Sequence, residues 1–536
     1  MGKLGQFYNT IPHLFSKKER RSSKTSDSLL IEPTTSQKIT HVDVLDQAVG
    51  YIGRWQIEIF ILMFIITTPS NWVELGIELF ANETDFWCKQ PNNNGTTKNS
   101  TLNQKTSKEI CQIQEELNKT QNVCPYGYDY DTSVVGTTII SEWNLVCDQH
   151  YLISITQILV MLGNLLGGVS FGIAADKCGR RPILIISCVL RFVFGISSGA
   201  APNITTFITL RFFLALFDGG IPGIALVTCL EVLGGKWRLI FAVLFEISFN
   251  LGFPVMALIT YWLQNWRYTQ VVLYASTFLT VLCAWLAPES PRWLLAVGKK
   301  SKVVKQLEKA AIKNKRDPAI VEDLVKEYHD EDKDATEDFC FCMYLFTIPK
   351  LRNRTILSCI NGMILFINTY GFYQLYGEFG QYPFWNLTIQ GLTTIVGSII
   401  SALIVTTWSR RRTLAGTSFI MGVCSFLLIV LPKNAITQNT ITAILFCCVG
   451  VMMSITEPLI GELFPTVLRN SGFGIFSVFV SIGAMISPVI VSLESVYWFL
   501  PNSIFSLLSF LEIIFVLLLP EIKDEELYET VEDVGI

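Results

Sequence analysis

The chain has 536 residues, of which 50% are hydrophobic and only 16% are charged. Soluble domains usually carry charge on about 25% of their residues, and a soluble chain of this length would divide into several cores rather than become more apolar. The net charge of −4 excludes a nucleic-acid-binding protein, which needs a strongly basic surface. The composition therefore predicts a membrane protein.

Long apolar segments recur through the chain. A membrane-spanning helix needs about 20 mostly apolar residues, and about twelve segments meet this length. We predict an all-α polytopic membrane protein with spans near 54–75, 150–174, 182–200, 204–232, 239–262, 268–287, 355–376, 387–408, 413–432, 438–460, 467–493 and 497–519. The predicted organisation is a tail 1–53, a six-helix half 54–287, a polar loop 288–354 with short amphipathic helices, a six-helix half 355–519 and a tail 520–536.

The charges of the short loops predict the orientation. Lysine and arginine are enriched in cytosolic loops. The short loops on one side hold nine of them, namely Lys177, Arg180, Arg181, Lys236, Arg238, Arg410, Arg411, Arg412 and Arg469, whereas the other side holds Arg267 and Lys433. We therefore expect both termini and the loop 288–354 to be cytosolic.

The loop at about 76–149 is then extracellular. It carries four glycosylation sequons, at Asn82, Asn94, Asn99 and Asn118. It also holds four cysteines, Cys88, Cys111, Cys124 and Cys147. Four cysteines in an oxidising compartment predict two disulfides, and the sequence leaves all three pairings open.

A charged motif separates the second and third spans. It runs from Gly172 through Asp176 and Gly179 to Arg180 and Arg181. Glycine permits a tight turn, and the aspartate and arginines can form charge-assisted bonds that latch neighbouring helix ends and break when the halves move. The alternative is an ordinary basic loop.

Related motifs stand at equivalent places in the two halves. Arg410 and Arg411 follow the eighth span, six spans after the first motif, as an internal repeat predicts, although the Asp and Gly are missing there. Glu289 and Arg292 follow the sixth span, and Glu521 follows the twelfth. We expect these glutamates to accept hydrogen bonds from the basic latch residues.

These motifs resemble the major facilitator superfamily, and more specifically the solute carrier 22 family of organic cation, organic anion and carnitine transporters. The resemblance covers about 50–521. It rests on the large loop after the first span, the string Ser141-Glu142-Trp143-Asn144-Leu145-Val146-Cys147-Asp148, the run Pro288-Glu289-Ser290-Pro291-Arg292-Trp293-Leu294, and Glu462-Leu463-Phe464-Pro465-Thr466 before Arg469. It implies a major facilitator fold in the plasma membrane and adds Glu462 and Arg469 to the cytosolic gate.

Ionisable residues inside spans are functional candidates because each costs about 2.5–3.5 kcal/mol to insert. They are Arg191, Arg211, Asp218, Glu246, Glu457 and Glu512. Asp218 either faces a substrate cavity or forms a structural pair with Arg191 on the neighbouring span. Glu512 is expected to be structural, because the twelfth span is peripheral in the resembled fold.

Other polar residues extend this set. Glu246 and Asn250 are four positions apart and predict a polar stripe facing the cavity. Glu457 precedes Pro458, in a span that lines the cavity of the resembled fold; the alternative is a glutamate near the helix end. Gln157 and Asn164 form a second stripe that suits helix–helix bonding as well as substrate contact.

Tyrosines and one serine complete the candidate substrate site. Tyr370 and Tyr373 could bind an ammonium group by cation–π attraction, or belong to an interfacial aromatic belt. The resembled family tends to have Asp in cation carriers and Arg in anion or carnitine carriers at a position of the eleventh span that is Ser481 here. The charge of the substrate must then be inferred from the other ionisable residues expected to face the cavity. Among these, acids outnumber bases, which favours a cation or a zwitterion.

We therefore predict a secondary transporter of small organic cations or zwitterions such as carnitine, working by alternating access around a midplane site. Both a facilitator and a carrier coupled to H+ or Na+ fit the sequence. The alternatives are an organic anion transporter of the same family and a non-transporting sensor with a transporter fold. We find no metal-binding, cofactor-binding or catalytic motif in the sequence that would indicate an enzyme.

Overall fold

The computed structural model describes residues 41–82, 84–89, 110–111, 124–327, 345–377, 383–405, 407–431, 434–464 and 469–520. Twelve helical segments among them are long and apolar enough to cross a membrane, which confirms the predicted all-α polytopic fold. The predicted glycosylation sites Asn94, Asn99 and Asn118 and the C-terminal Glu521 lie outside the described residues.

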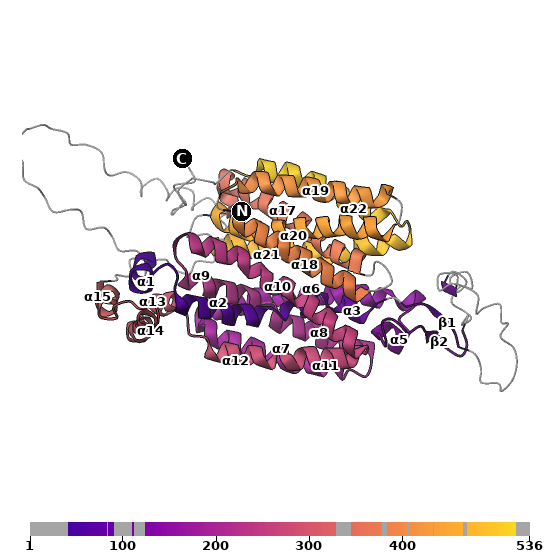
Figure 1. Ribbon diagram of the computed structural model, residues 1–536, viewed down its shortest axis with the longest axis horizontal. Coiled ribbons are helices and arrows are strands. Elements are labelled where there is room, and N and C mark those ends of the chain that lie inside the picture. The colour runs from indigo at the N-terminus through magenta and orange to yellow at the C-terminus, as the bar shows by residue number, and fades with distance from the viewer. Residues whose placement is uncertain are drawn as a thin grey trace, which may run out of the picture. The chain divides into compact units, whose positions relative to one another are not determined.

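The N half, residues 54–286, contains the first six spans (Figure 1). Its helices are α2 (Arg54–Thr67), α3 (Ser70–Phe80), α6 (Tyr151–Cys178), α7 (Arg180–Gly199), α8 (Ile204–Asp218), α9 (Ile221–Val232), α10 (Gly235–Leu263), α11 (Trp266–Ser276) and α12 (Phe278–Leu286). Three spans are broken into two helices. Pro69 and Pro222 stand at two of the breaks, where the missing backbone N–H weakens the helical ladder.

The C half, residues 349–518, contains the other six spans (Figure 1, orange to yellow). Its helices are α17 (Pro349–Gly377), α18 (Pro383–Ile404), α19 (Arg410–Val430), α20 (Ala435–Leu463), α21 (Arg469–Ser492) and α22 (Leu500–Leu518), with the short 3-10 helix η3 (Leu493–Ser495) before α22. The halves pack through α10 against α18 and through α6 against α21.

Glycines allow close helix crossings inside each half. A Cβ atom on Gly167 of α6 would lie 2.0 Å from the carbonyl oxygen of Leu216, and one on Gly450 of α20 would lie 2.1 Å from that of Thr394. Lipid tails are as apolar as leucine, so helices in a membrane associate by such close backbone packing rather than by the hydrophobic effect.

The described part of the first loop is cross-linked and anchored to the N half. Strands β1 (Phe86–Cys88) and β2 (Tyr128–Tyr130) pair antiparallel, followed by α5 (Ile139–Trp143) and the 3-10 helix η2 (Cys147–Gln149). The disulfides are Cys88–Cys124 and Cys111–Cys147, one of the three pairings that the sequence left open.

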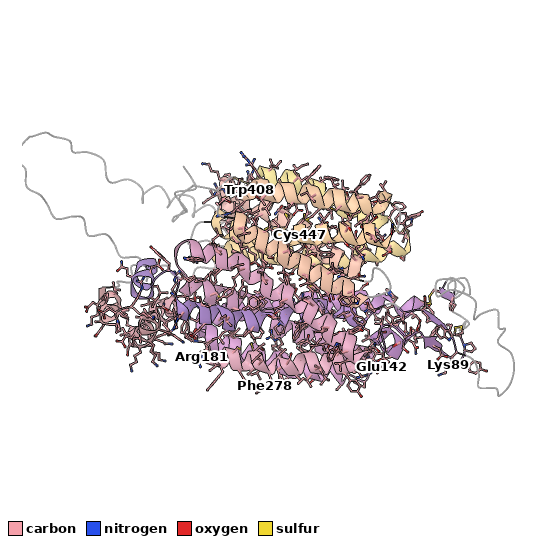
Figure 2. The ribbon with its side chains drawn as sticks, viewed as in Figure 1. Lys89, Glu142, Arg181, Phe278, Trp408 and Cys447 are labelled. Atoms are coloured by element: carbon pink, nitrogen blue, oxygen red, sulfur yellow. A yellow bond between two sulfur atoms is a disulfide. The ribbon has the colours of Figure 1, made fainter. Side chains whose placement is uncertain are left out.

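The string around Glu142 forms this anchor (Figure 2). The Glu142 carboxylate accepts a hydrogen bond of 2.7 Å from the indole of Trp266 and pairs with the Arg267 guanidinium at 2.5 Å. Arg267 also donates to two carbonyl oxygens at the end of α7, at 2.9 and 2.7 Å. This string, one of the features on which the resemblance rests, therefore ties α5 to α7 and α11.

The segment between the sixth and seventh spans contains helices α13 (Pro291–Ala296), α14 (Lys300–Lys313) and α15 (Ala319–Glu327), in agreement with the short amphipathic helices that we predicted. Asn314 joins this segment to the start of the N half. Its side-chain amide donates to the carbonyl oxygen of Val49, in α1 (His41–Val49), and its side-chain oxygen accepts from the Trp55 N–H, both at 3.0 Å.

Candidate functional site: a carboxylate-lined cavity

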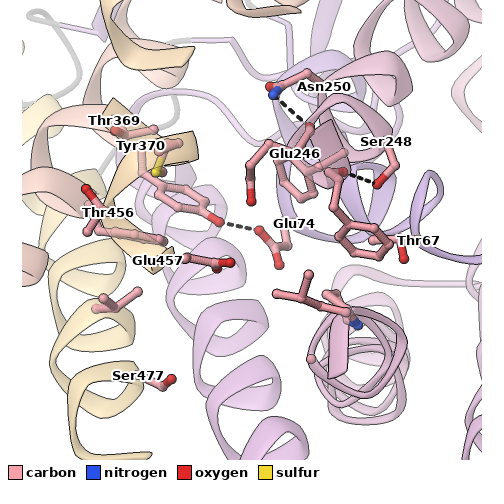
Figure 3. A pocket seen from close by; sticks show the side chains of 18 of the residues that line it. Thr67, Glu74, Glu246, Ser248, Asn250, Thr369, Tyr370, Thr456, Glu457 and Ser477 are labelled. Carbon is pink, nitrogen blue, oxygen red and sulfur yellow. Dashed lines mark hydrogen bonds between the residues drawn. The ribbon is translucent and has the colours of Figure 1, made fainter. Parts of the chain in front are cut away.

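A cavity of about 220 Å³ lies between the two halves (Figure 3). The N half contributes residues of α2, α3, α9 and α10, and the C half contributes residues of α17, α20 and α21. A substrate held here would contact both halves at once. This is the arrangement that alternating access around a central site requires.

Three carboxylates line the cavity, and no lysine, arginine or histidine does so among the residues that the structure describes. They belong to Glu74 of α3, Glu246 of α10 and Glu457 of α20 (Figure 3). Glu74 and Glu246 come from the N half and Glu457 from the C half. A cavity with acids on several sides and no basic counter-ion attracts cations, because charge interactions are strong where water is scarce.

Glu74 is held in place by neutral donors from two helices, α6 and α17. Its carboxylate accepts hydrogen bonds from the Asn164 amide at 2.8 Å and from the Tyr370 hydroxyl. Its carbonyl oxygen accepts from the Gln157 amide at 2.8 Å. The buried Arg211 donates to the carbonyl of the preceding residue at 2.7 Å. The stripe of Gln157 and Asn164 therefore bonds α6 to α3.

Sequence reasoning missed Glu74. The residue lies inside the first predicted span, 54–75, so the rule that selected the other acids would have selected it too. It stands one residue before the end of that span, where a charged residue is easily taken for part of the following loop.

Five predicted substrate-binding residues do line this cavity: Glu246, Asn250, Tyr370, Tyr373 and Glu457. The Asn250 amide donates to the Glu246 carbonyl at 3.0 Å, and the Tyr373 hydroxyl donates to the Asn250 oxygen at 3.4 Å. Tyr370 and Tyr373 are only 6% and 3% exposed. This places both rings between the halves rather than in an interfacial aromatic belt.

Asp218 lies elsewhere, in the core of the N half. It is fully buried and pairs with Arg191, whose guanidinium nitrogen is 2.9 Å from its carboxylate oxygen. The Ser70 hydroxyl donates to the same oxygen at 3.2 Å. Arg191 also donates to the Ile66 carbonyl and the Thr280 hydroxyl, at 3.0 and 2.8 Å. Asp218 is not among the cavity-lining residues, so of our two alternatives the geometry favours the structural pair.

Ser481 and Glu512 also lie outside the cavity lining. The Ser481 hydroxyl is half-buried and donates to the carbonyl oxygen of Ser477 on its own helix at 2.9 Å, whereas Ser477 and Val480 line the cavity. The predicted position is thus close in sequence to cavity-lining residues but is not itself part of the lining. Glu512 is fully buried in α22.

The comparisons with known proteins decide the family. The model of the family described as "Sugar (and other) transporter" matches residues 75–533. The chain belongs to this family. It is therefore a multi-pass membrane transporter, and its twelve helices and its relatives agree with that assignment.

Its relatives include members of the solute carrier 22 family. An organic cation transporter-like protein of Drosophila melanogaster is 28% identical over 520 residues, covering 90% of each chain. Solute carrier family 22 member 1 of Oryctolagus cuniculus is 28% identical over 535 residues, covering 92% of this chain and 94% of its own. The resemblance that we identified in the motifs is confirmed.

A solved structure shows the same fold. The xylose transporter XylE from E. coli, in an inward open conformation, aligns with a TM-score of 0.60 over 88% of this chain and 98% of its own. The identity is 14%, so this likeness concerns the fold alone. It confirms the major facilitator fold of the transporter.

The latch motif of the transporter joins helix ends within the N half. Arg180 pairs with Asp176 at 3.0 Å and with Glu231 at 3.1 Å. One oxygen of Glu289 accepts the backbone N–H groups of Arg180 and Arg181, at 2.9 and 3.2 Å. The ends of α6, α7 and α9 are thereby tied to the segment before α13.

Glycine is required at the turn of this motif. Gly179 has a φ of +106°, and a Cβ atom there would lie 2.6 Å from a carboxylate oxygen of Glu289.

Two further arginines belong to this end of the N half. Arg181 donates to the Trp285 carbonyl at 2.6 Å. The half-buried Arg292 lies in α13, and its Nε has no hydrogen-bond partner among the described residues.

The equivalent motif of the C half follows the eighth span. Arg411 donates to the carbonyl oxygen of Leu519 at 3.0 Å, so it reaches the end of the twelfth span as the repeat predicts. Arg410 begins α19. The side chains of Glu462 and Arg469 lie outside the described part of the chain.

Asn82 is the one predicted glycosylation site that the structure describes. Its side chain is buried and donates to the Leu79 carbonyl at 3.3 Å.

Proposed function

We propose that this transporter carries small organic cations, or zwitterions with a cationic group such as carnitine, across the plasma membrane by alternating access. The observation that carries the proposal is the cavity between the halves, with three carboxylates and no basic residue among its described lining. An anionic substrate would meet repulsion from all three acids. The names of the relatives, which include an organic cation transporter-like protein, favour the same class.

The aromatic lining supports a cationic substrate as well. Tyr370 and Tyr373 lie beside Phe366 and Phe476 in the cavity wall. Aromatic faces attract ammonium groups and accommodate their methyl groups, a contact worth about 2 kcal/mol when it is desolvated. The carboxylates would then supply charge attraction and the rings would supply shape.

Contacts between the halves identify the groups that would have to move. The Tyr370 hydroxyl bonds to Glu74 across the halves, and Tyr373 stacks on Phe253 with ring centroids 4.6 Å apart. Tyr261 meets Phe384 at 5.9 Å, near the start of α18. In the orientation that we propose, with both termini cytosolic, these contacts close the extracellular end. Opening that end would free the Glu74 carboxylate for substrate.

Uptake measurements test the proposal. Cells expressing the chain should accumulate labelled quaternary ammonium compounds or carnitine saturably, and aromatic anions should be poor substrates. Glu74→Gln, Glu246→Gln and Glu457→Gln should each raise KM roughly 10- to 100-fold, as expected for losing a hydrogen bond to a charged group. Measured surface expression would normalise the rates.

The matched control is Glu78→Gln. Glu78 lies one helical turn after Glu74 on α3 but is not among the cavity-lining residues, so its neutralisation should leave KM within about 2-fold. Saturable uptake of anions with no uptake of cations would favour the organic anion alternative. Surface expression without saturable uptake of any class would favour a sensor with a transporter fold.

A further inference from the structure

A second hollow, of about 670 Å³, lies at the end of the N half beside α13 and α14. Five cationic side chains line it: Arg181, Lys299, Lys302, Lys305 and Lys309. Figure 2 labels Arg181 at this end of the N half. Among the described residues of its lining, the one acid is Glu289, so this lining carries an excess of positive charge. We call it the basic groove.

The lysines of α14 form a regular stripe. Lys302, Lys305 and Lys309 are three and four positions apart and share one face of the helix. The opposite face buries Val303 and Leu307 against the rest of the segment. The helix is therefore fixed in rotation by its apolar face, which directs the lysine stripe into the groove.

Acids do not neutralise this stripe. No ion pair joins Lys302, Lys305 or Lys309 to another described residue, whereas Lys313 pairs with Glu58 and Lys326 with Glu322. Glu289 is engaged by backbone N–H groups, including that of Ser290 at 3.1 Å. The three lysines thus remain available to an external anion.

The groove continues into an apolar surface. Trp55, Pro182 and Ile185 complete its lining on the side of the membrane spans. At the end of α12, Trp285, whose carbonyl oxygen accepts from the lining Arg181 at 2.6 Å, and Leu286 are each 64% exposed. A surface with a cationic pocket at one end and exposed apolar side chains at the other matches the two parts of a lipid. A soluble anion would use only the cationic part.

We propose that the basic groove binds the phosphorylated headgroup of an anionic lipid, of the polyphosphorylated inositol lipid class, with the acyl chains lying over the exposed apolar ends of α7 and α12. The four lysines and the arginine carry more positive charge than the single negative charge of a phosphodiester can neutralise. Phosphomonoesters carry more negative charge and more acceptor oxygens, and therefore match the groove better. Anionic lipids are concentrated in the cytosolic leaflet, which is the side where the loop charges place this groove.

Lipid binding to the purified full-length transporter tests this inference. The probe is a short-chain fluorescent phosphatidylinositol bisphosphate, titrated at physiological salt, with phosphatidylserine and soluble inositol trisphosphate as competing ligands. The variant K302Q/K305Q/K309Q should bind the probe on the order of 100-fold more weakly, since each lysine near an anionic lipid contributes about 5-fold.

The matched control is K300Q/K315Q/K326Q, which removes the same net charge from lysines that do not line the groove. It should weaken binding by less than about 3-fold, because none of these three side chains lines the groove and salt screens exposed charges. Melting temperatures equal to that of the wild type would verify that both variants are folded.

Three results would overturn the inference. Equal weakening by both triple variants would mean non-specific attraction. If inositol trisphosphate binds as tightly as the phosphatidylinositol bisphosphate probe, the groove is a site for soluble phosphates. If phosphatidylserine binds as tightly as that probe, the groove does not recognise the phosphomonoesters. Because binding is measured directly, none of these results depends on which substrate the central cavity takes.

Discussion

Neutralising Asp218 distinguishes a structural role from a substrate-binding role. Asp218→Asn removes the only acid that is paired with Arg191 among the described residues, while leaving Arg191 fully buried. Two unit charges about 4 Å apart attract by about 4 kcal/mol at an effective dielectric constant near 20. Removing one partner of a buried pair usually costs about 3–5 kcal/mol, because the other charge stays buried. We expect a destabilisation of about 3 kcal/mol, less than the whole pair because Arg191 keeps its bonds to Ile66 and Thr280.

The assay is thermal melting of the purified variants together with uptake per molecule at the cell surface. Asp218→Asn should lower both the melting temperature and surface expression, whereas the KM of the molecules that reach the surface should stay close to wild type. Adding Arg191→Gln should recover part of the lost stability, because the double variant no longer buries the Arg191 charge without its partner. The coupling between the two positions would then be about 2–3 kcal/mol.

A wild-type melting temperature for Asp218→Asn combined with a large rise in KM would refute this reasoning. Asp218 would then contact substrate, as in the first of the two roles that the sequence allowed. The absence of any recovery in the double variant would equally contradict a pairwise interaction with Arg191.

The remaining predictions concern packing and the first loop. Gly167→Ala should destabilise the N half by about 1–3 kcal/mol, because its Cβ would overlap a carbonyl of α8, whereas Gly172→Ala on the same helix, with no atom within 4 Å of its Cβ, should be tolerated in the same melting assay. Arg267→Lys should cost about 2 kcal/mol despite keeping the charge, since an ammonium cannot reproduce the guanidinium fork; wild-type stability would argue against the anchor. Cys88→Ser should release one additional alkylatable thiol, at Cys124, in the denatured unreduced protein, located by mass mapping of the alkylated peptides, and should cost about 4 kcal/mol for a loop whose ends are 36 residues apart; a new thiol at Cys111 or Cys147 instead would mean a different pairing.

The spans could be predicted from the sequence because they are local. A run of about 20 apolar residues determines a membrane helix wherever its neighbours lie, and the twelve helices agree with the predicted segments to within a few residues at most ends. Breaks at Pro69 and Pro222 and the turn at Gly179 are local as well, because each depends on the backbone of that residue. The motif Arg180–Arg181 was likewise recognisable without knowledge of its partners.

Tertiary structure alone decided which polar residues meet. The rotation of each helix depends on close crossings such as that of Gly167 against α8, and these crossings join residues that are remote in sequence. The sequence therefore identified Asp218 and Glu246 as buried acids with equal reason, and only packing placed one beside Arg191 and the other in the cavity.

The same reason applies to the cysteines and to Glu74. Each of the three disulfide pairings satisfies the composition of the loop, and only the folded chain brings Cys88 to Cys124. Glu74 became a site residue because Tyr370, 296 positions later, reaches it from the other half. By itself the sequence determined that this protein spans the membrane twelve times and carries a few charges within its spans. The packing of the helices decided which of those charges surround a central cavity and which remain structural, because a side chain's neighbours across a helix interface are set by contacts between distant segments.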